Sequence, residues 1–485
     1  MMLYKKTAHE LSAMLKNKEV SSEELTRTML SRIDSMDGEI GAFVTVCADE
    51  AIARAKLVDE KIKRGEVLAP LAGIPGAIKD NINIKGVRTT CSSRILENFI
   101  SPYDATVIEK LDANDAIYIG KSNMDEFAMG STTETSYFKK TKNPWDTSCV
   151  PGGSSGGSAA AVSAQEAIWA LGSDTGGSIR QPSAFTGIVG MKPTYGRVSR
   201  YGCVAFASSL DQIGALTRDV TDCALVMNAI SGHCEKDSTS YNVEAPDLTN
   251  ALKGDIKGLK VGVPKEYFAE GLDKDVEVQV RAAIKQLESL GAEIVEVSLP
   301  HTEYAVATYY IIGPAEASAN LARFDGVKYG YRSPGAKNIT EMMIRSRSEG
   351  LGQEVQRRIM IGTYVLSSGF YDAYYNKAMK VRTLINEDFK KVFENVDVIV
   401  CPTTPTPAFE IGSKLDPISL YMLDAYTIPV NMAGLPAISV PCGFSGKRPV
   451  GLQIIGKALD EMNVIKTAYA YEQSTDFHKK LAGEE

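Results

Sequence analysis

The feature that most constrains this fold is a stretch rich in glycine, serine and alanine between residues 151 and 190. It contains two loops, which read Pro-Gly-Gly-Ser-Ser-Gly-Gly-Ser from Pro151 and Gly-Ser-Asp-Thr-Gly-Gly-Ser-Ile-Arg from Gly172. Loops of this composition are often flexible linkers. The segment between them, residues 159–171, is apolar and rich in small side chains, which suits close packing. We therefore expect both loops to be held rigidly at the ends of buried elements.

Helical and strand patterns alternate in the second half of the chain. Apolar residues at helical spacing run through 274–290, stop at Gly291 and give way to the strand-like segment 293–297. Further strands are expected at 259–263, 396–401, 437–442 and 450–455. A sheet flanked by helices, and hence an α/β fold, follows from this alternation.

The N-terminal region predicts two amphipathic helices. Thr7 with Glu10, and Ser21 with Glu24, each match a capping box that opens an apolar repeat. The apolar residues within 25–33 then fall on one helical face.

Two polar segments rich in glycine and proline interrupt the pattern, at 233–258 and at 330–353. We interpret both as surface excursions rather than domain boundaries. The second is read as a solvated loop, with a mobile lid or a partner contact as the alternative.

Composition limits the classes of function. The net charge of −7 argues against a dominant nucleic-acid surface, which usually shows a basic excess. The eight cysteines form no CxxC pair and no dense cluster, as expected of reduced thiols. The N-terminus lacks the pattern of a signal peptide, and no apolar run reaches the roughly 18 residues of a membrane helix. We expect a cytoplasmic protein without a membrane partner.

Consecutive glycines let backbone N–H groups converge, so the two loops suggest an anion or oxyanion site. A nucleotide site is not supported, because neither GxxxxGK[ST] nor GxGxxG occurs in the chain. Residues 152–156 formally match the G-x-S-x-G nucleophile elbow, which is a weak signal in a glycine-rich run. A serine nucleophile also needs a base.

Histidine is a poor candidate for that base. The histidines lie in polar or terminal sequence, where we interpret them as surface residues, and no HExxH motif or cysteine pair supports a zinc site. They are His9, His233, His301 and His478.

Lysine is the known substitute for histidine in serine catalysis, and Lys79 lies where a Pro/Gly turn leads into a short apolar strand. The alternative is a strand-edge lysine that reaches solvent. To act as a base at neutral pH, a lysine must lose roughly three pKa units, about 4 kcal/mol of differential solvation, which requires burial or cationic surroundings.

Three motifs together match a known pattern. Lys79 within Gly-Ala-Ile-Lys-Asp, the loop 152–158 and the loop 174–182 resemble the amidase signature family in order and spacing. The likeness continues at 142–146, 190–199, 208–214 and 431–436. The resemblance implies a single α/β domain over residues 1–485, with a large mixed central sheet covered by helices on both sides. It also implies a helical N-terminal wrap at 1–65.

The resemblance also implies catalytic roles. Ser178 attacks the amide carbonyl, while Ser154, which follows a cis peptide bond, relays the proton of Ser178 to neutral Lys79. The implied oxyanion hole consists of the backbone N–H groups of Thr175, Gly176, Gly177 and Ser178. The neighbouring serines are interpreted as partners of the backbone and as helix caps; they are Ser155, Ser158 and Ser173.

Within this family, segments 124–131, 199–202 and 205–212 are similar to the glutaminase subunits of tRNA-dependent amidotransferases. Such a subunit hydrolyses glutamine, and its ammonia converts misloaded glutamate or aspartate on tRNA into the amide. The likeness implies a heterotrimer with amidotransferase B and C subunits. ATP, Mg²⁺ and most tRNA contacts belong to the B subunit, and this chain itself is expected to need no metal or cofactor.

The same likeness implies that Tyr309, Arg358 and Asp424 recognise glutamine. A guanidinium suits the carboxylate of a free amino acid, and a carboxylate suits its ammonium group. Surface salt bridges are the alternative for Arg358 and Asp424, and the adjacent Arg357 leaves an ambiguity of one residue.

Two other functions remain open at this point. A stand-alone amidase would keep the catalytic residues and change the pocket. A non-catalytic scaffold would have no reason to keep Lys79, Ser154 and Ser178 together. The sequence does not tell which tRNA is served, how ammonia travels or whether the chain is active alone.

Overall fold

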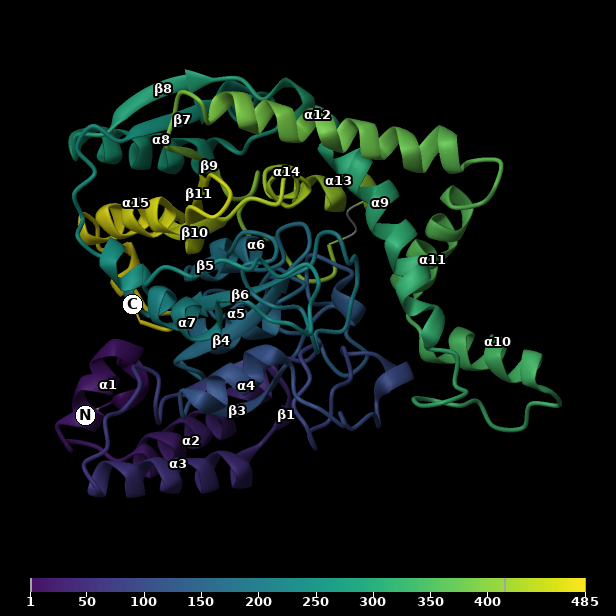
Figure 1. Cartoon of the computed structure of the whole chain (residues 1–485), viewed down its shortest axis with the longest axis horizontal. Coiled ribbons are helices and arrows are strands. Elements are labelled where there is room, and N and C mark those ends of the chain that lie inside the picture. Colours follow the sequence, from purple (N-terminus) through teal and green to yellow (C-terminus); the bar gives the residue numbers. More distant parts are fainter. Residues whose placement is uncertain (1, 414–415, 485) are drawn as a thin grey trace.

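The computed structural model describes residues 2–413 and 416–484, and its centre is one 11-stranded mixed sheet (Figure 1). The strand order is β1-β3-β2-β4-β6-β5-β10-β11-β9-β7-β8. The strands are β1 (Phe43–Val46), β2 (Pro75–Lys79), β3 (Ile117–Ser122), β4 (Trp169–Asp174), β5 (Val189–Lys192), β6 (Gln212–Thr217), β7 (Lys260–Pro264), β8 (Glu293–Val297), β9 (Val398–Pro402), β10 (Ala437–Ser445) and β11 (Arg448–Gly456). Parallel pairs at β3-β2-β4 and at β9-β7-β8 flank an antiparallel centre.

Alternate residues of one strand belong to different hydrophobic cores, because successive side chains point to opposite faces. In β9, Val398 and Val400 lie in one core, and Ile399 and Cys401 lie in the other. The sheet is therefore buried on both faces by helices, as expected from the sequence. The helices are α1 (Ala8–Lys16), α2 (Ser22–Ile40), α3 (Ala48–Lys63), α4 (Thr106–Ala113), α5 (Gly156–Ser163), α6 (Arg180–Thr186), α7 (Val220–Ile230), α8 (Lys274–Ser289), α9 (Ala305–Asn320), α10 (Ile339–Gly350), α11 (Gln353–Val365), α12 (Lys377–Val392), α13 (Pro417–Met422), α14 (Ile428–Met432) and α15 (Glu461–Gln473).

The predicted helix starts and strands are confirmed. Thr7 caps α1 in a full capping box with Glu10, and the Ser21 hydroxyl accepts the N–H of Glu24 at the start of α2. Helix α8 ends before Gly291, whose φ of +94° favours glycine, and β8 follows. The four further strands correspond to β7, β9, β10 and β11.

The segment 330–353 is not only a loop, because it contains α10. Asn338 caps this helix by accepting the N–H of Glu341, a signal that the surrounding glycines obscured. The segment 233–258 is mostly irregular, with one short helical turn at Leu248–Ala251. Among the described helices, none has both the length and the apolar character required to cross a membrane.

The region 1–65 contains α1, α2 and α3, as the predicted wrap requires, but it also contributes β1 to the edge of the sheet. Helices α2 and α3 pack against each other below β3 in Figure 1. The first helices are thus joined to the same sheet as the remainder of the chain.

Candidate active site

The sheet brings the two glycine-rich loops and Lys79 to one edge. Strands β2 and β4 are parallel neighbours, so their carboxyl ends lie side by side. Lys79 is the last residue of β2, and Asp174 ends β4 and leads into the loop 175–179. The other loop precedes α5, where the Ser158 hydroxyl donates to the carbonyl of Leu171 in β4.

The Lys79 ammonium is buried among serine oxygens. Its Nζ lies 2.8 Å from Ser154 Oγ, 2.8 Å from Ser155 Oγ, 3.0 Å from Ser173 Oγ and 3.2 Å from the Ser173 carbonyl oxygen. Within the described ranges, no carboxylate lies within 4.0 Å of this nitrogen. The interpretation of Lys79 as a solvent-reaching strand-edge lysine is therefore wrong.

Burial without a close counter-ion lowers the pKa of Lys79 to about 8. Lys121, in the neighbouring strand β3, provides a contrast: it is equally buried, but its Nζ lies 3.3 Å from Asp80. Because pH 7 lies about one unit below this pKa, about a tenth of the Lys79 side chains carry a neutral amine there.

The three serine hydroxyls around Lys79 differ in their other hydrogen bonds. Ser155 Oγ donates to the carbonyl of Ser173 at 3.0 Å. Ser173 Oγ already receives a hydrogen bond from Asn81 Nδ2 at 3.0 Å, so its oxygen serves as an acceptor there. Ser154 Oγ has no partner other than Lys79 among the described residues. The hydroxyl protons of Ser154 and Ser173 are therefore both free for neutral Lys79 among the described residues. Ser154 is the better placed of the two, because it adjoins Ser155, whose N–H holds the loop of Ser178.

Ser178 is the partly exposed residue in an otherwise buried loop. Its hydroxyl has no hydrogen-bond partner in the described part of the chain, so no direct hydrogen bond joins Ser178 Oγ to Ser154 Oγ. The two loops are tied together by the N–H of Ser155, which donates to the Ser178 carbonyl at 3.1 Å. The Gly153–Ser154 peptide is cis, as the resemblance implies.

The oxyanion prediction needs one correction. The N–H of Gly177 donates to Asp174 Oδ1 at 2.8 Å and is therefore occupied. The N–H groups of Thr175, Gly176 and Ser178 make no hydrogen bond within residues 2–413 and 416–484. These three remain the donors available to a developing oxyanion.

The loop 175–179 is fixed by a buried ion pair. Arg180 Nε and Nη2 each lie 3.0 Å from a carboxylate oxygen of Asp174, and the Ile179 N–H donates to the same carboxylate. Asn431 and Gln453 complete the network. Arg180 holds the pKa of Asp174 well below its usual range.

The loop around Ser154 is fixed from its other side by Asp125 and Gln181. Gln181 Oε1 accepts the Gly153 N–H at 2.9 Å. A Cβ atom at Gly153 would lie 2.1 Å from Asp125 Oδ2, so this position requires glycine. Asp125 is held in turn by the N–H groups of Thr132 and Thr133.

Tyr309, Arg358 and Asp424 are all buried near this edge. The Tyr309 ring lies against Gly176, where an added Cβ would be 3.0 Å from ring carbons. Asp424 accepts the Ser131 hydroxyl at 2.6 Å, and burial raises the pKa of Asp424 to about 7.

Arg358 lies over the Tyr310 ring at 5.2 Å and is paired through Nε with Glu354 at 2.9 Å. A cavity of about 120 Å³ adjoins it. Its lining includes Ser131, Thr132, Arg357, Arg358 and Tyr421. The Arg358 side chain is 4% exposed and that of Arg357 is 42% exposed, so Arg358 is the buried member of the pair.

Ser155 and Ser173 contact Lys79 directly, beyond the backbone and capping roles that the sequence suggested for them. Ser158 does bond to the backbone of β4. The signal available in the sequence was their position in the same two loops: Ser155 directly follows Ser154, and Ser173 lies five residues before Ser178. Asn81, two residues after Lys79, was missed as well.

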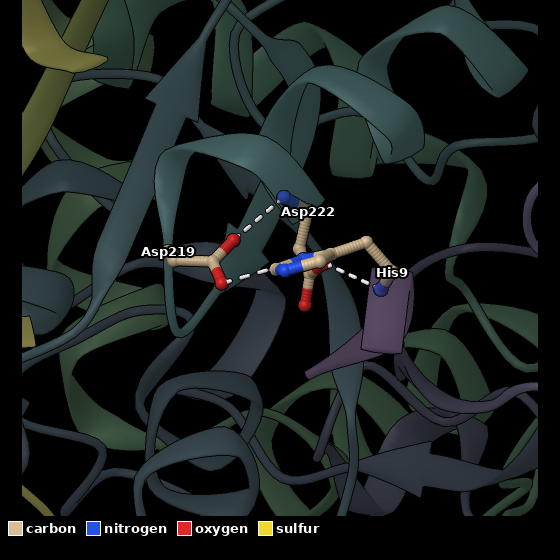
Figure 2. A group of neighbouring side chains, drawn as sticks. All are labelled: His9, Asp219 and Asp222. Carbon is tan, nitrogen blue, oxygen red and sulfur yellow. Dashed lines mark hydrogen bonds and ion pairs between the residues drawn. The ribbon is translucent and has the colours of Figure 1, made fainter. Parts of the chain in front are cut away.

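Away from this site, His9 forms a cluster with Asp219 and Asp222 (Figure 2). His9 Nδ1 lies 2.9 Å from Asp222 and 3.6 Å from Asp219. Asp222 also accepts the N–H groups of Ala8 and His9, so its oxygens already join α1 to α7. We interpret the cluster as a structural ion pair. No histidine of the described chain hydrogen-bonds to Lys79 or to the serines around it.

A buried lysine among serine hydroxyls, beside free N–H groups of a glycine-rich loop, is the arrangement of a serine amidohydrolase. This arrangement, on a mixed sheet covered by helices, places the protein in that class.

The comparison with known proteins specifies the family. A family model described as Amidase matches residues 24–465, and the chain belongs to the amidase signature family. It is 60% identical to the A subunit of the glutamyl-tRNA(Gln) amidotransferase of Moorella thermoacetica, over 99% of each chain. The crystal structure of the Thermotoga maritima protein of that name covers 97% of this chain and 95% of its own, with 45% identity and a TM-score of 0.81. The peptide amidase of Stenotrophomonas maltophilia is 29% identical, with 97% of each chain covered and a TM-score of 0.82.

Proposed function

We propose that this chain is the glutaminase subunit of a tRNA-dependent amidotransferase, which hydrolyses glutamine to supply ammonia. The observation that carries the chemistry is Lys79, which lies among serine oxygens without a carboxylate nearby. The similarity over the full length to proteins named as the A subunit of glutamyl-tRNA(Gln) amidotransferase supports the substrate and the assembly.

In the proposed mechanism, neutral Lys79 accepts the proton of Ser154, and Ser154 accepts the proton of Ser178 as Ser178 Oγ attacks the amide carbon of glutamine. Closing this relay requires the Ser178 hydroxyl to turn toward Ser154 when substrate binds. The oxyanion is stabilised by the N–H groups of Thr175, Gly176 and Ser178.

The relay then returns its proton to the leaving nitrogen, so that ammonia departs and an ester of Ser178 remains. Water hydrolyses this ester by the same relay and releases glutamate.

The proposed glutamine site uses the three buried polar residues near the loop. Arg358 binds the α-carboxylate, Asp424 binds the α-ammonium, and Tyr309 positions the side-chain amide beside Gly176. Binding would require Arg358 to exchange part of its pairing with Glu354 for the substrate. An arginine with several free donors permits this exchange.

The proposed complex also contains B and C subunits in the cytoplasm. The B subunit would bind ATP, Mg²⁺ and most of the tRNA, while this chain needs no cofactor for hydrolysis. The acidic balance of the chain suits such a division.

Ammonia release from glutamine, by the purified chain alone and with B and C subunits, tests this proposal. We expect weak release by the chain alone, stimulation by the partners, and a loss of about 10⁴-fold or more in Ser178→Ala. If the chain alone releases ammonia as fast as the full complex does, the expected stimulation by the partners is refuted. If glutamine is inert and a simple amide is cleaved in a Ser178-dependent way, the protein is a stand-alone amidase.

A further inference from the structure

The loop that carries Ser131 and the helix that carries Arg358 form two walls of one cavity. Residues within 130–135 and within α11 both line the cavity of about 120 Å³. In the proposed site, the Ser131 hydroxyl of the first wall binds Asp424, and Arg358 belongs to the second wall. Recognition of the α-groups of glutamine therefore depends on how these two walls are held relative to each other.

Helix α11 begins without a cap of its own. Its N-cap residue is Gly352, which has no side chain, and the third residue of the helix is Val355. In a capping box, a glutamate at that third position accepts the N–H of the N-cap residue. Valine has no such acceptor, so the N–H of Gly352 needs an acceptor from elsewhere in the chain.

Glu126 supplies this acceptor from a segment 226 residues away in the sequence. Its Oε2 accepts the N–H of Gly352 at 2.8 Å, and its Oε1 accepts the hydroxyl of Ser93. A Cβ atom at Gly352 would lie 2.2 Å from Glu126 Oε2 and would push the carboxylate away. The contact thus explains why a glycine, rather than an ordinary capping residue, stands at the start of α11.

Glu126 is anchored at the same time to the first wall of the cavity. Its N–H donates to Thr135 Oγ1 at 3.1 Å, and the neighbouring Asp125 accepts the Thr135 hydroxyl at 2.8 Å. Thr135 lines the cavity together with Ser131. Glu126 therefore joins one wall of the cavity to the start of the other.

Glu126 is also a buried acid without a cation. The residue is 3% exposed, and among the described residues no lysine, arginine or histidine nitrogen lies within 4.0 Å of its carboxylate. Such burial is costly, and it raises the pKa of Glu126 to about 7. Positions that break a general packing rule in this way mark functional or strained sites.

We propose that Glu126 is a positioning residue of the glutamine site. By holding the start of α11 against the loop of Ser131, it sets the position of Arg358, an inference that rests on the proposed function. Arg358 follows Gly352 by six residues, or roughly 9 Å along the helix. Loss of the Glu126 contact would therefore displace the group that binds the α-carboxylate and leave the centre around Lys79 in place.

The test compares ammonia release from two amides by variants of the full chain. Propionamide has the side-chain amide of glutamine but neither α-group, so in the proposed site its hydrolysis makes no use of Arg358. Glu126→Met removes the acceptor with little change in side-chain size. We expect it to raise KM for glutamine by about tenfold while kcat stays within about threefold. Its kcat/KM for propionamide should stay within about twofold of wild type.

A conservative substitution should restore glutamine binding. The side chain introduced by Glu126→Gln keeps an oxygen for the N–H of Gly352. It is a close match, because about half of the Glu126 side chains are neutral at pH 7. We therefore expect Glu126→Gln to keep KM for glutamine within about twofold of wild type.

Glu472→Met is the matched control. Glu472 is also 3% exposed, and it accepts the N–H of Val220 at 2.8 Å at the start of α7, which carries none of the proposed site residues. Glu126→Met and Glu472→Met should both lower the melting temperature, because each leaves a helix N–H without its acceptor. Glu472→Met should nevertheless leave KM for glutamine within about twofold.

An unchanged KM for glutamine in Glu126→Met, an equal rise in Glu472→Met, or a parallel loss with propionamide overturns the inference and leaves the proposed function standing. Glu126→Gln as impaired as Glu126→Met overturns it too. If Glu126→Met does not fold, Ser93→Ala, which removes the hydroxyl on Glu126 Oε1, decides. A rise of about threefold in KM for glutamine alone then supports the inference, and an unchanged KM overturns it. A wild-type chain that cleaves propionamide but not glutamine overturns the proposed function and this inference together.

Discussion

At the residue scale, the proposed relay depends on which hydroxyl can give a proton to Lys79. Ser154 and Ser155 lie at the same distance from Nζ, but the Ser155 proton is engaged by the Ser173 carbonyl. Two adjacent serines, equally close and equally buried, therefore have different chemical capacities.

This difference predicts unequal effects of two matched substitutions. Ser154→Ala should lower kcat for glutamine hydrolysis by about 10³-fold, the usual range for removing a proton-transfer group. Ser155→Ala removes a hydrogen bond of about 1 kcal/mol and should cost less than about tenfold. Steady-state kinetics with melting curves of both variants provides the measurement. A greater loss in Ser155→Ala would assign the relay to Ser155.

The pKa of Lys79 predicts the pH dependence of hydrolysis. In the proposed mechanism the neutral amine is the base, so kcat/KM should rise with pH, by about tenfold per unit below the pKa, and level off above about 8. Burial raises the pKa of Asp424 to about 7. Since its ionised form binds the substrate ammonium in the proposed site, Asp424 should add a second rise of kcat/KM with pH at this lower pKa. Asp424→Asn should remove the lower limb alone. A flat profile between pH 6 and 9 in wild type would contradict a lysine base.

At the scale of elements, the site is assembled where strands end and helices begin. β2 delivers Lys79, β4 delivers the loop of Ser178, and the loop before α5 delivers Ser154. The Asp174–Arg180 pair then joins β4 to α6, and breaking such a buried pair typically costs about 3–5 kcal/mol. A buried carboxylate joins two elements at α1 as well, because Asp222 of α7 accepts the N–H groups of Ala8 and His9.

The His9 ion pair predicts a pH-dependent contribution to stability. The hydrogen bond with Asp222 raises the pKa of His9, so its stabilisation is fully present below the unfolded pKa and is lost as pH rises through the folded value. His9→Gln should lower the free energy of unfolding by roughly 0.5 kcal/mol at pH 5.5 and have little effect at pH 8.5, since the pair is partly exposed. Urea titrations at both pH values measure the difference. A larger effect at pH 8.5 would show that the charge is not responsible.

At the scale of the whole molecule, one sheet passes through every region of the described chain. β1 and β8 form its two edges although they come from the N-terminal region and the middle of the sequence. We propose on this basis that residues 1–485 form one domain, with the helices of 1–65 as part of it.

A single domain predicts coincident unfolding seen by different probes. Trp145 and Trp169 both lie in the first half of the chain, so their fluorescence reports locally, whereas far-UV circular dichroism reports all helices. We expect the two signals to change with one midpoint in guanidinium chloride. Two separated midpoints would indicate that the half containing α8, β7 and β8 folds independently.

The sequence by itself determined the family and the α/β class, and it predicted the catalytic trio, because motif order and capping signals are local properties of the chain. It also placed Gly291 and the strands around it, since a helix stop and a buried strand need no distant partner to be recognised. The segment 330–353 is predicted from its glycine content as a loop, although Asn338 within it caps α10.

Only the tertiary structure decided how the polar groups are shared. The N–H of Gly177 is bound by Asp174 and the proton of Ser155 by the Ser173 carbonyl, and among the described residues no carboxylate pairs with Lys79. Arg358, rather than Arg357, is buried because α11 turns that face toward α9. Each of these outcomes depends on side chains brought together from separate strands and helices, and a linear sequence does not specify such distances.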